Sequence, residues 1–263
     1  MSKVISLFSG SKGNSFYISC NRTSVLIDAG VSAKSLCLRM EECGIIPEEL
    51  SAIFITHEHS DHIKGLRVFA DKYLIPVYGS KGTLDALDQF GLLPRKARVE
   101  VISRNGTDIG DVFVRSFSTP HDCREPKGYV CETSDGKRIS VCTDLGYVSP
   151  VVKSSVAGSD FVLLESNHDI NMLKNGAYPP ALKKRILGMF GHLSNDACDE
   201  LLVPLVESGT TRIMLGHISQ DNNSVALALS SARKSLFSGG CKENEDYLIY
   251  AADVCGNDGF IAL

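Results

Sequence analysis

Residues 57–62 read HEHSDH, which places three histidines and two acids in six positions. The zinc-protease motif HExxH does not fit, because it needs histidine at position 61, where this chain has aspartate. In an extended chain, residues two apart point the same way, so His57 and His59 can bind one ion. Asp61 and His62 then turn towards a second ion where the chain enters its next helix. The stretch therefore predicts half of a site for two metal ions.

Residues from other parts of the chain are needed to complete the two coordination spheres. Five apolar runs end at or just before a residue that can bind a metal: Asp28, His57, His121, Asp144 and His217. Side chains at the carboxyl ends of neighbouring strands converge at one edge of a sheet, so we expect these residues to meet. Imidazole nitrogen and carboxylate oxygen suit zinc and also manganese, and the carboxylate of Asp144 is suited to bridging two ions.

Such a pair of ions would carry out hydrolysis. Two divalent ions about 3.5–4 Å apart can hold a bridging hydroxide, because metal-bound water loses a proton near neutral pH. The same ions can stabilise the attacking and the leaving oxygen. Asp61 would orient the hydroxide or receive its proton.

The elements that must position these residues alternate between short strands and helices. Apolar, β-rich runs predict strands at 3–8, 15–20, 24–28, 51–56, 75–79, 97–102, 111–118, 137–144, 160–165, 211–217 and 246–251. Helices are predicted at 32–44, 80–91, 194–209 and 223–237. Ser32, Ser80 and Ser194 are the expected N-caps, and Pro204 is expected to kink or divide the third helix. Without a repeat or linker, the pattern predicts a single layered α/β domain over residues 1–263.

Composition narrows the class of protein. The chain is 43% hydrophobic and 22% charged, and it has neither an uncharged apolar stretch of membrane-spanning length nor the apolar region of a signal peptide. We therefore expect a soluble cytoplasmic protein without a membrane partner. Its nine cysteines form no CxxC pair and lie mostly in apolar surroundings, which favours reduced core thiols over disulfides or structural zinc.

The charge pattern neither demands nor excludes a nucleic-acid substrate. The formal net charge is -4, so no global positive field attracts phosphate. The basic runs at 95–98 and 182–185 can supply a local phosphate path or be ordinary solvated surface.

The order of Asp28, the HxHxDH stretch and the later ligands resembles that of the metallo-β-lactamase fold superfamily along most of the chain. The resemblance implies a four-layer αββα sandwich. It implies that one metal is held by His57, His59 and His121, that the other is held by Asp61, His62 and His217, and that Asp144 joins them. Asp28 would support the site without ligating. Histidine rather than glutamate at position 59 implies hydrolysis rather than di-iron redox chemistry.

Two later segments resemble the nuclease and phosphodiesterase branch that includes transfer-RNA 3′-processing ribonucleases. They read LLESNHD at 163–169 and FGHLSNDACDELL at 190–202. By this resemblance His192 would donate a proton to the leaving oxygen or brace the phosphate, with Glu165 as its carboxylate partner. The alternative is a structural histidine at the entry of a helix. His168 would contact substrate, support the site or be a plain loop residue.

The opening LFSGSKGNSFYI at 7–18, together with THEHSDHIKG and GHLSN, resembles the YycJ/WalJ group of bacterial proteins, which are 5′-to-3′ exonucleases on double-stranded DNA. The opening is not a Walker loop, because GxxxxGK[ST] is absent. It would either line the phosphate path or form a tight strand connection, and the residues concerned are Ser9, Ser11, Lys12 and Asn14. Only 72 residues, 145–216, separate two ligand motifs, too few for the large cap domain of β-CASP nucleases. The substrate path must then come from short loops, which leaves room for a homodimer.

The sequence therefore predicts a phosphodiester hydrolase with two divalent ions, Zn²⁺ or Mn²⁺, acting through a metal-bridging hydroxide as a 5′-to-3′ DNA exonuclease. One alternative is a thioester or lactone hydrolase of the same fold, similar to glyoxalase II, in which GHLSN and LLESNHD have no clear role. The other is a non-catalytic metal-binding module, in which lost ligands would be expected, whereas every ligand position here is filled.

Overall fold

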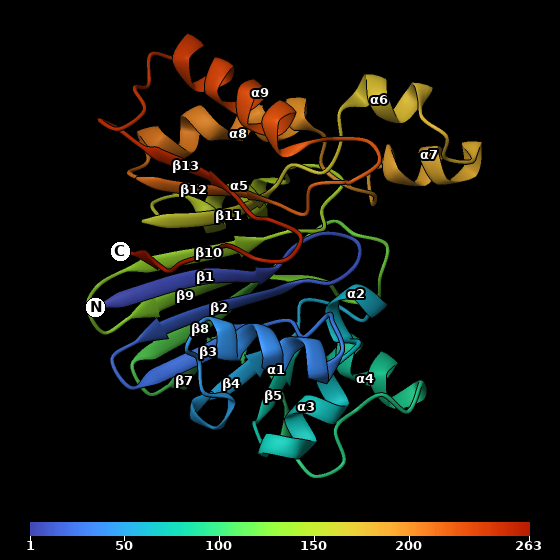
Figure 1. The fold of residues 1–263 in the computed structure, drawn as a ribbon, viewed down its shortest axis with the longest axis vertical. Helices are drawn as coiled ribbons and strands as arrows, with labels where there is room; N and C mark the ends of the chain where they lie inside the picture. Colours follow the sequence, from blue (N-terminus) through green and yellow to red (C-terminus); the bar gives the residue numbers. More distant parts are fainter. The chain divides into compact units, whose positions relative to one another are not determined.

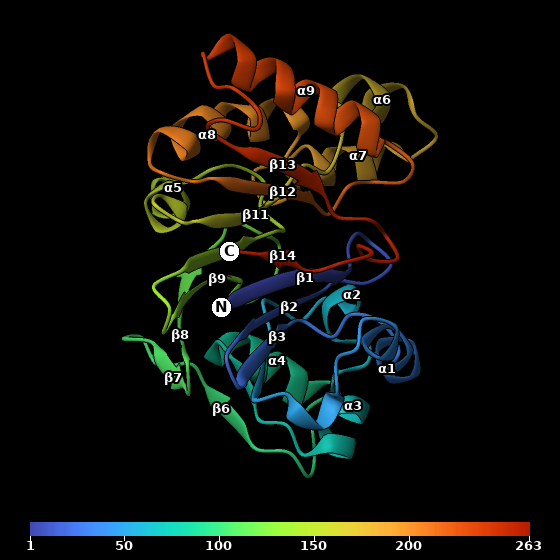
Figure 2. The same cartoon turned by 60° about the vertical axis from the view of Figure 1, so that its left-hand side comes forward.

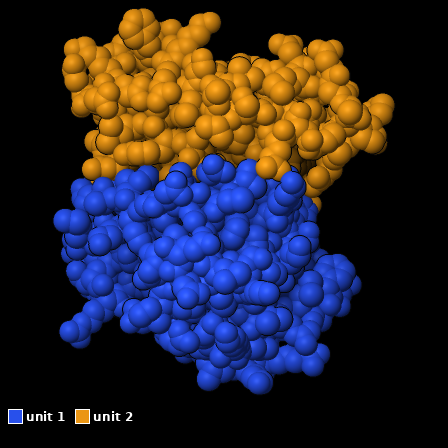
Figure 3. Space-filling model, viewed as in Figure 1, with its two compact units in different colours: residues 1–116, 123–137, 253–263 blue, residues 117–122, 138–252 orange.

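The computed structural model describes residues 1–263 and divides into two compact units, which Figure 3 colours separately. Unit 1 comprises residues 1–116, 123–137 and 253–263, and unit 2 comprises residues 117–122 and 138–252. The prediction of one domain over 1–263 stays a prediction. No helix of either unit is both long enough and apolar enough to cross a membrane.

Unit 1 is built on a seven-stranded sheet in the order β14-β1-β2-β3-β4-β5-β6 (Figures 1 and 2). Its strands are β1 (Ser2–Phe8), β2 (Ser15–Cys20), β3 (Thr23–Ile27), β4 (Ala52–Phe54), β5 (Val77–Gly79), β6 (Val99–Val101) and β14 (Ile261–Ala262). The pairs β1–β14, β1–β2 and β2–β3 are antiparallel, whereas β3, β4, β5 and β6 run parallel to their neighbours. The carboxyl ends of β3 and β4 therefore lie at one edge, where Asp28 and the HEHSDH stretch begin.

The helices of unit 1 bury their apolar faces in one core. They are α1 (Ala33–Glu42), α2 (Ser60–Ile63), α3 (Leu66–Tyr73) and α4 (Lys81–Gln89), with a short 3₁₀ turn at Pro47–Glu49. Leu36 and Phe69 are fully buried among strand residues such as Ile53. Each such side chain contributes about 1.5–3 kcal/mol by leaving water. The predicted N-caps are confirmed: Ser32 accepts from the backbone of Ser35, and Ser80 accepts from that of Thr83.

Three further strands complete the secondary structure of this part of the chain: β7 (Thr107–Ile109), β8 (Val112–Ser118) and β9 (Lys127–Thr133). Neither β7 nor β9 was predicted. β9 begins with Lys127 and Gly128, which are poor strand formers, so the sequence does not show that residues from Gly128 to Cys131 form a buried strand. The hydroxyl of Tyr129 in β9 donates to the carbonyl of Ile55 at 2.5 Å, so β9 supports the segment that leads to His57.

Unit 2 contains four parallel strands in the order β13-β12-β11-β10, namely β10 (Arg138–Cys142), β11 (Phe161–Glu165), β12 (Arg212–Gly216) and β13 (Leu248–Ala251). Its helices are α5 (Pro150–Val156), α6 (Ile170–Asn175), α7 (Pro180–Ile186), α8 (Asn195–Glu207) and α9 (Val225–Ser238). Figures 1 and 2 show α8 and α9 side by side next to β12 and β13. As in unit 1, parallel strands deliver several side chains to one edge.

Helix α8 corrects one half of a sequence expectation, which was that Pro204 would kink or divide the helix; the kink stays a prediction. Ser194 caps it as predicted, by accepting from the backbone of Ala197, but α8 is not divided at Pro204 and runs on to Glu207. Proline removes one backbone hydrogen bond. The buried side chains of Leu201 and Leu205, on either side of it, keep both halves packed on the core. The helices α3, α5, α6 and α7 were not predicted, because each is at most eight residues long and too short for a clear periodic pattern.

Candidate metal centre

Three candidate residues occupy an unusual backbone conformation at strand ends. Asp28 and His217 directly follow β3 and β12, and Asp144 lies two residues beyond the end of β10; their φ angles are 64°, 54° and 60°. This left-handed region costs a residue with a side chain about 1–2 kcal/mol, and such strain clusters at functional sites. The sharp turn it produces directs each side chain out of the strand end.

The HEHSDH stretch of unit 1 places its ligand atoms in two pairs. Nε2 of His57 lies 3.0 Å from Nδ1 of His59. Nε2 of His62 lies 3.5 Å from Oδ2 of Asp61. His59 is the extended N-cap of α2, so the chain turns between the two pairs, as the sequence predicts. Glu58 takes no part in either pair, because its Oε1 accepts the backbone N–H of Arg124 at 2.7 Å.

Asp28 is the hub that orients the rings of this stretch. Its Oδ2 accepts Nδ1–H of His62 at 2.7 Å and the hydroxyl of Thr56 at 2.8 Å, and its Oδ1 accepts the backbone N–H of Thr56 at 2.8 Å. The oxygen of Thr56 in turn accepts Nδ1–H of His57 at 3.0 Å. Burial raises the pKa of Asp28, and the attraction of His62 opposes that rise. Asp28 therefore supports the rings, and Nε2 is the atom that His57 and His62 offer to an ion.

The SGSKGN loop underlies the same stretch. The backbone N–H of Asn14 donates to the carbonyl of Asp61 at 2.8 Å, and its side-chain nitrogen lies 3.1 Å from Nε2 of His62. Asn14 and Ser9 are buried, whereas Ser11 and Lys12 are exposed. Of the four residues predicted to line a phosphate path, the exposed pair can meet a substrate in this conformation, and Asn14 positions the ligands.

In unit 2, Asp144 lies between two histidines. Its Oδ1 is 3.7 Å from Nε2 of His121 and 3.6 Å from Nε2 of His217. Nδ1–H of His121 donates to the carbonyl of Gly191 at 2.9 Å, which fixes that ring with Nε2 towards the carboxylate. All three of these side chains are buried. A carboxylate in this place can serve two ions, as the sequence predicts for Asp144.

Glu165, at the end of β11, orients two histidines of unit 2. Its Oε1 accepts Nδ1–H of His192 at 2.8 Å and Nδ1–H of His217 at 3.0 Å. Its Oε2 accepts the backbone N–H groups of Leu145 and Leu193. Burial by itself would raise the pKa of Glu165, but the charge of His192 and the hydrogen bonds of His192 and His217 lower it to about 2. Glu165 is therefore an ionised, fully buried acceptor.

His192 and His168 have different surroundings. The ring of His192 is partly exposed, lies 5.1 Å from that of His121 and stacks 5.2 Å from that of His217. His192 thus lies against the other candidate ligands and is partly accessible to solvent. His168 is 1% exposed, and neither of its ring nitrogens has a hydrogen-bond partner. Burial lowers its pKa, so His168 is a neutral ring inside unit 2 in this conformation.

The donor set fits divalent ions. The four ligand pairs described above are 3.0, 3.5, 3.6 and 3.7 Å apart. Two ligands bound at about 2.0–2.1 Å to a tetrahedral ion are about 3.3 Å apart. The longer separations exceed the length of a hydrogen bond between nitrogen and oxygen, so they are better explained as edges of a coordination shell. Backbone or side-chain acceptors fix the Nδ1 atoms of four of the rings, as is usual for metal-bound histidine.

Sequence reasoning missed several supporting groups. Thr56 links His57 to Asp28, and Asn167 donates to the carbonyl of His217 at 2.9 Å. The bond from Glu165 to His217 was also missed, although Glu165 was expected to contact His192. Only position gave a signal, because Thr56 directly precedes His57 and Asn167 lies in the segment LLESNHD.

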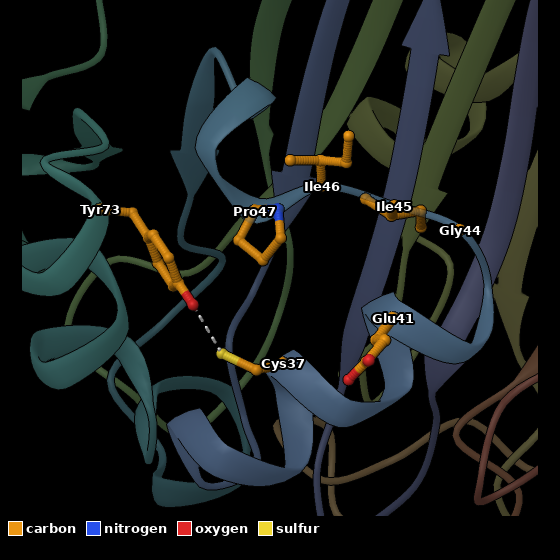
Figure 4. Close-up of a pocket in the computed structure, with 7 residues that line it drawn as sticks. All are labelled: Cys37, Glu41, Gly44, Ile45, Ile46, Pro47 and Tyr73. Carbon is orange, nitrogen blue, oxygen red and sulfur yellow. Dashed lines mark hydrogen bonds between the residues drawn. The ribbon is translucent and has the colours of Figure 1, made fainter.

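One hollow of unit 1 is not part of the ligand cluster. It has a volume of about 340 Å³ and lies beside α1 and α3 (Figure 4). Its thiol and hydroxyl pair with each other, since Sγ of Cys37 is 3.3 Å from Oη of Tyr73, and the ammonium of Lys72 donates to the same hydroxyl. The hollow contains no histidine, and its single acid is Glu41, so it offers no metal site.

Known proteins resemble the chain over almost its whole length. A family model described as a beta-lactamase superfamily domain matches residues 23–218. The exodeoxyribonuclease YycJ of Bacillus anthracis is 36% identical over 248 residues, which cover 94% of this chain and 94% of the relative. The exodeoxyribonuclease WalJ of Streptococcus pneumoniae is 36% identical over 247 residues, or 93% of this chain and 91% of the relative.

A solved structure agrees at the level of the fold. The metallo-beta-lactamase fold protein YhfI of Bacillus subtilis superposes with a TM-score of 0.72 at 16% identity, and the match covers 97% of this chain and 98% of that protein. A likeness at this identity establishes the architecture and leaves chemistry to be argued from the residues.

Proposed function

The chain belongs to the metallo-β-lactamase superfamily, and on that premise we propose that it is a metal-dependent exonuclease that removes nucleotides from the 5′ ends of DNA. The α/β metallo-β-lactamase fold expected from the sequence is confirmed. The observation that carries the proposal is the similarity to two exodeoxyribonucleases along 93–94% of the chain. The DNA substrate and the 5′-to-3′ polarity are part of this proposal. The cytoplasmic location and the homodimer stay predictions.

Two divalent ions, zinc or manganese, are the proposed cofactors. One would be held by His57, His59 and His121, the other by Asp61, His62 and His217, and both by Asp144. The donor pairs within each unit support this assignment, because their separations match the edges of a coordination shell. When bound, such ions polarise a phosphate oxygen and lower the pKa of water.

Two side chains of this protein are the proposed base and acid of the reaction. Asp61 is the proposed base, since its carboxylate is 22% exposed and remains within reach of a water molecule. His192 is the proposed acid that protonates the leaving oxygen. The hydrogen bond from its Nδ1 to Glu165 at 2.8 Å fixes the orientation of the ring and leaves Nε2 as the atom that can face a substrate.

A panel of end-labelled nucleic acids tests the proposal. Single- and double-stranded DNA and RNA, labelled at the 5′ or the 3′ end, are incubated with the wild type under zinc or manganese. We expect release of labelled mononucleotide from 5′-labelled double-stranded DNA, and a loss of about 10²- to 10⁴-fold in Asp61→Ala. Asp88→Ala, which changes an exposed acid on α4, is the control and should retain activity.

Two outcomes would overturn the proposal. One is the absence of cleavage of every DNA and RNA form while both metals are bound. The other is hydrolysis of a thioester or lactone that outpaces cleavage of phosphodiesters, which would favour the small-molecule hydrolase. That alternative gives no role to the Glu165–His192 pair.

A further inference from the structure

A hollow of about 400 Å³ lies in unit 2 beside α7 and the segment that leads to His192. Its lining includes Lys184, Met189 and Phe190, and we call it the Phe190 hollow. Its volume is within the range of about 300–1,000 Å³ typical of small-molecule sites. No residue of the hollow is a proposed metal ligand, so it is a separate surface from the ligand cluster.

The apolar side of the Phe190 hollow is open to water. Phe190 is 58% exposed, Met189 is 65% exposed and the neighbouring Leu187 is 43% exposed. Scattered apolar residues on a surface need no explanation, but three within four consecutive positions, two of them lining a hollow, indicate a binding surface. An exposed aromatic ring is suited to stack on a planar partner.

The other side of the hollow is basic. The side chain of Lys184 is exposed, and its ammonium forms no hydrogen bond or ion pair within the protein. Arg185, by contrast, is held by both oxygens of Asp122, at 2.5 and 2.8 Å, and that bond ties α7 to the loop of His121. Lys184 is therefore the cation available to an anionic ligand, whereas Arg185 fixes α7 to the loop of His121.

Backbone hydrogen bonds connect the wall of the hollow to the segment that carries His192. The backbone N–H of His192 donates to the carbonyl of Ile186 at 3.0 Å, and that of Gly191 donates to Gly188 at 2.9 Å. Gly146 packs so closely that a Cβ there would lie 2.3 Å from the carbonyl oxygen of Met189. The ring of Phe190 thus lies two residues from the proposed acid, on a backbone fixed from both sides.

We propose that the Phe190 hollow binds the 5′-terminal nucleotide of DNA, with its base stacked on Phe190 and its phosphate near Lys184. The inference rests on the proposed exonuclease. An aromatic face next to an unpaired cation matches the two chemical parts of a nucleotide, a planar base and a phosphate. The position beside His192 matches the nucleotide that leaves.

The reaction balances with the terminal nucleotide in this place. The oxygen of water forms a bond to the phosphorus that follows the terminal sugar, and the bond from that phosphorus to O3′ breaks. Water gives one proton to Asp61, and His192 gives one proton to O3′. The terminal nucleotide leaves with a 3′-hydroxyl, and the shortened strand keeps a new 5′-phosphate.

Two substitutions in the hollow test the inference. Phe190→Ala removes the ring, and Phe190→Tyr keeps it. We expect Phe190→Ala to raise KM for 5′-labelled double-stranded DNA about 5- to 100-fold, Phe190→Tyr to restore it, and kcat to change less. Phe237→Ala removes an 82% exposed ring on α9 and is the matched control. Lys184→Ala should weaken substrates that carry a 5′-phosphate more than those with a 5′-hydroxyl.

Binding without cleavage gives an independent measurement. DNA with 2-aminopurine as its 5′-terminal base, joined to the next nucleotide by a non-hydrolysable phosphodiester analogue, is added to the metal-loaded protein. Stacking on Phe190 should quench its fluorescence in the wild type and in Phe190→Tyr, but not in Phe190→Ala. A duplex with 2-aminopurine ten nucleotides inside should show no such difference.

The outcomes separate this inference from the proposed function. If the wild type degrades DNA from 5′ ends while Phe190→Ala keeps the same KM and the same quenching, the hollow is not a nucleotide site. If the wild type cleaves bis(p-nitrophenyl) phosphate but no nucleic acid, the exonuclease proposal itself is wrong. An abasic 5′ terminus that is removed as efficiently as a normal one would also contradict stacking on Phe190.

Discussion

Oε1 of Glu165 lies 3.0 Å from Nδ1 of His217, and the same oxygen accepts Nδ1–H of His192. The two oxygens of this carboxylate together accept four N–H groups, two from imidazoles and two from the backbone. An amide in its place has a single acceptor oxygen and would set its NH₂ group against two of those donors. Ionised glutamate is therefore the side chain that this position requires.

We accordingly expect Glu165→Gln to lower metal affinity or activity about 10- to 100-fold. Equilibrium dialysis against zinc, followed by kcat on DNA, measures both. Glu207→Gln changes an exposed acid at the end of α8 and should behave as the wild type. Full metal content and activity in Glu165→Gln would show that hydrogen bonding to Glu165 is unimportant.

Asp144→Asn should disturb both ions, because Oδ1 of Asp144 faces Nε2 of two histidines. Loss of its charge removes a shared ligand, whereas His121→Ala removes a ligand of one ion. Native mass spectrometry should find about two ions in the wild type and about one in His121→Ala. Asp144→Asn should bind fewer ions than His121→Ala. A full complement of metal in Asp144→Asn would rule out its bridging position.

Removal of metal should lower thermal stability. An ion that binds the folded state alone stabilises it by about 2.7 kcal/mol at a free concentration of 100 times its Kd. The melting temperature should therefore fall in EDTA and return when zinc is added back. His57→Ala, which lacks one ligand, should respond less. Equal melting curves of the wild type with and without zinc would contradict the proposed centre.

Gly30→Ala should destabilise unit 1 severely. A Cβ at this position would lie 1.7 Å from the carbonyl oxygen of Asp61 and 2.6 Å from the nitrogen of Asn14. Backbone must move to admit it, which we expect to cost about 3 kcal/mol or more. Gly259→Ala adds the same methyl group where no atom lies within 4 Å and is the control. Urea denaturation compares the two, and similar midpoints would show that the HEHSDH stretch moves freely.

Asp199→Asn should stabilise the protein at high pH only. Burial, helped by the charge of Asp196, raises the pKa of Asp199 from 3.8 to about 6, while a hydrogen bond from Ser231 opposes the rise. The carboxyl is protonated in both states below 3.8, so the penalty for ionising it grows as the pH rises from 3.8 and is complete above about 6. We expect a gain of about 1–2 kcal/mol at about pH 8 and none at about pH 3.5, since partial exposure reduces the full effect.

Thermal unfolding across this pH range measures the difference. Asp88→Asn, on the exposed face of α4, is the control and should follow the wild type throughout. A stabilisation by Asp199→Asn that is independent of pH would mean that ionisation of Asp199 is not its cause.

The residues that follow apolar runs could be predicted from the sequence, because a strand and the residue after it are local features. Asp28, Asp144 and His217 are of this kind. Glu165 shows what could not be predicted. It meets His217 because β11 pairs with β12 in the register Glu165 to Gly216, and a pairing between strands 47 residues apart leaves no local pattern.

The fold was predictable to the same extent. Long strands and the capped helices α1, α4 and α8 follow from periodicity and Ser caps. α7 was missed, since seven residues beginning with proline give no clear period, and with it the Phe190 hollow was missed. The basic run at 182–185 was recognised as a charge pattern. The exposed ring of Phe190 could be linked to it only in the structure, where α7 places both beside one hollow.

At Asp28, Asp144 and His217 the left-handed backbone makes the requirements of folding stability and of catalysis oppose each other. Glycine adopts this conformation without steric cost, so glycine at any of the three would relieve strain. Glycine at Asp144 or His217 would also remove a proposed metal ligand, so a selection for heat resistance would favour glycine there only in the absence of metal, and the stable variants would be inactive. Selection that also demands turnover would keep the strained side chains, and thermostable catalysts of this kind must draw their stability from other positions.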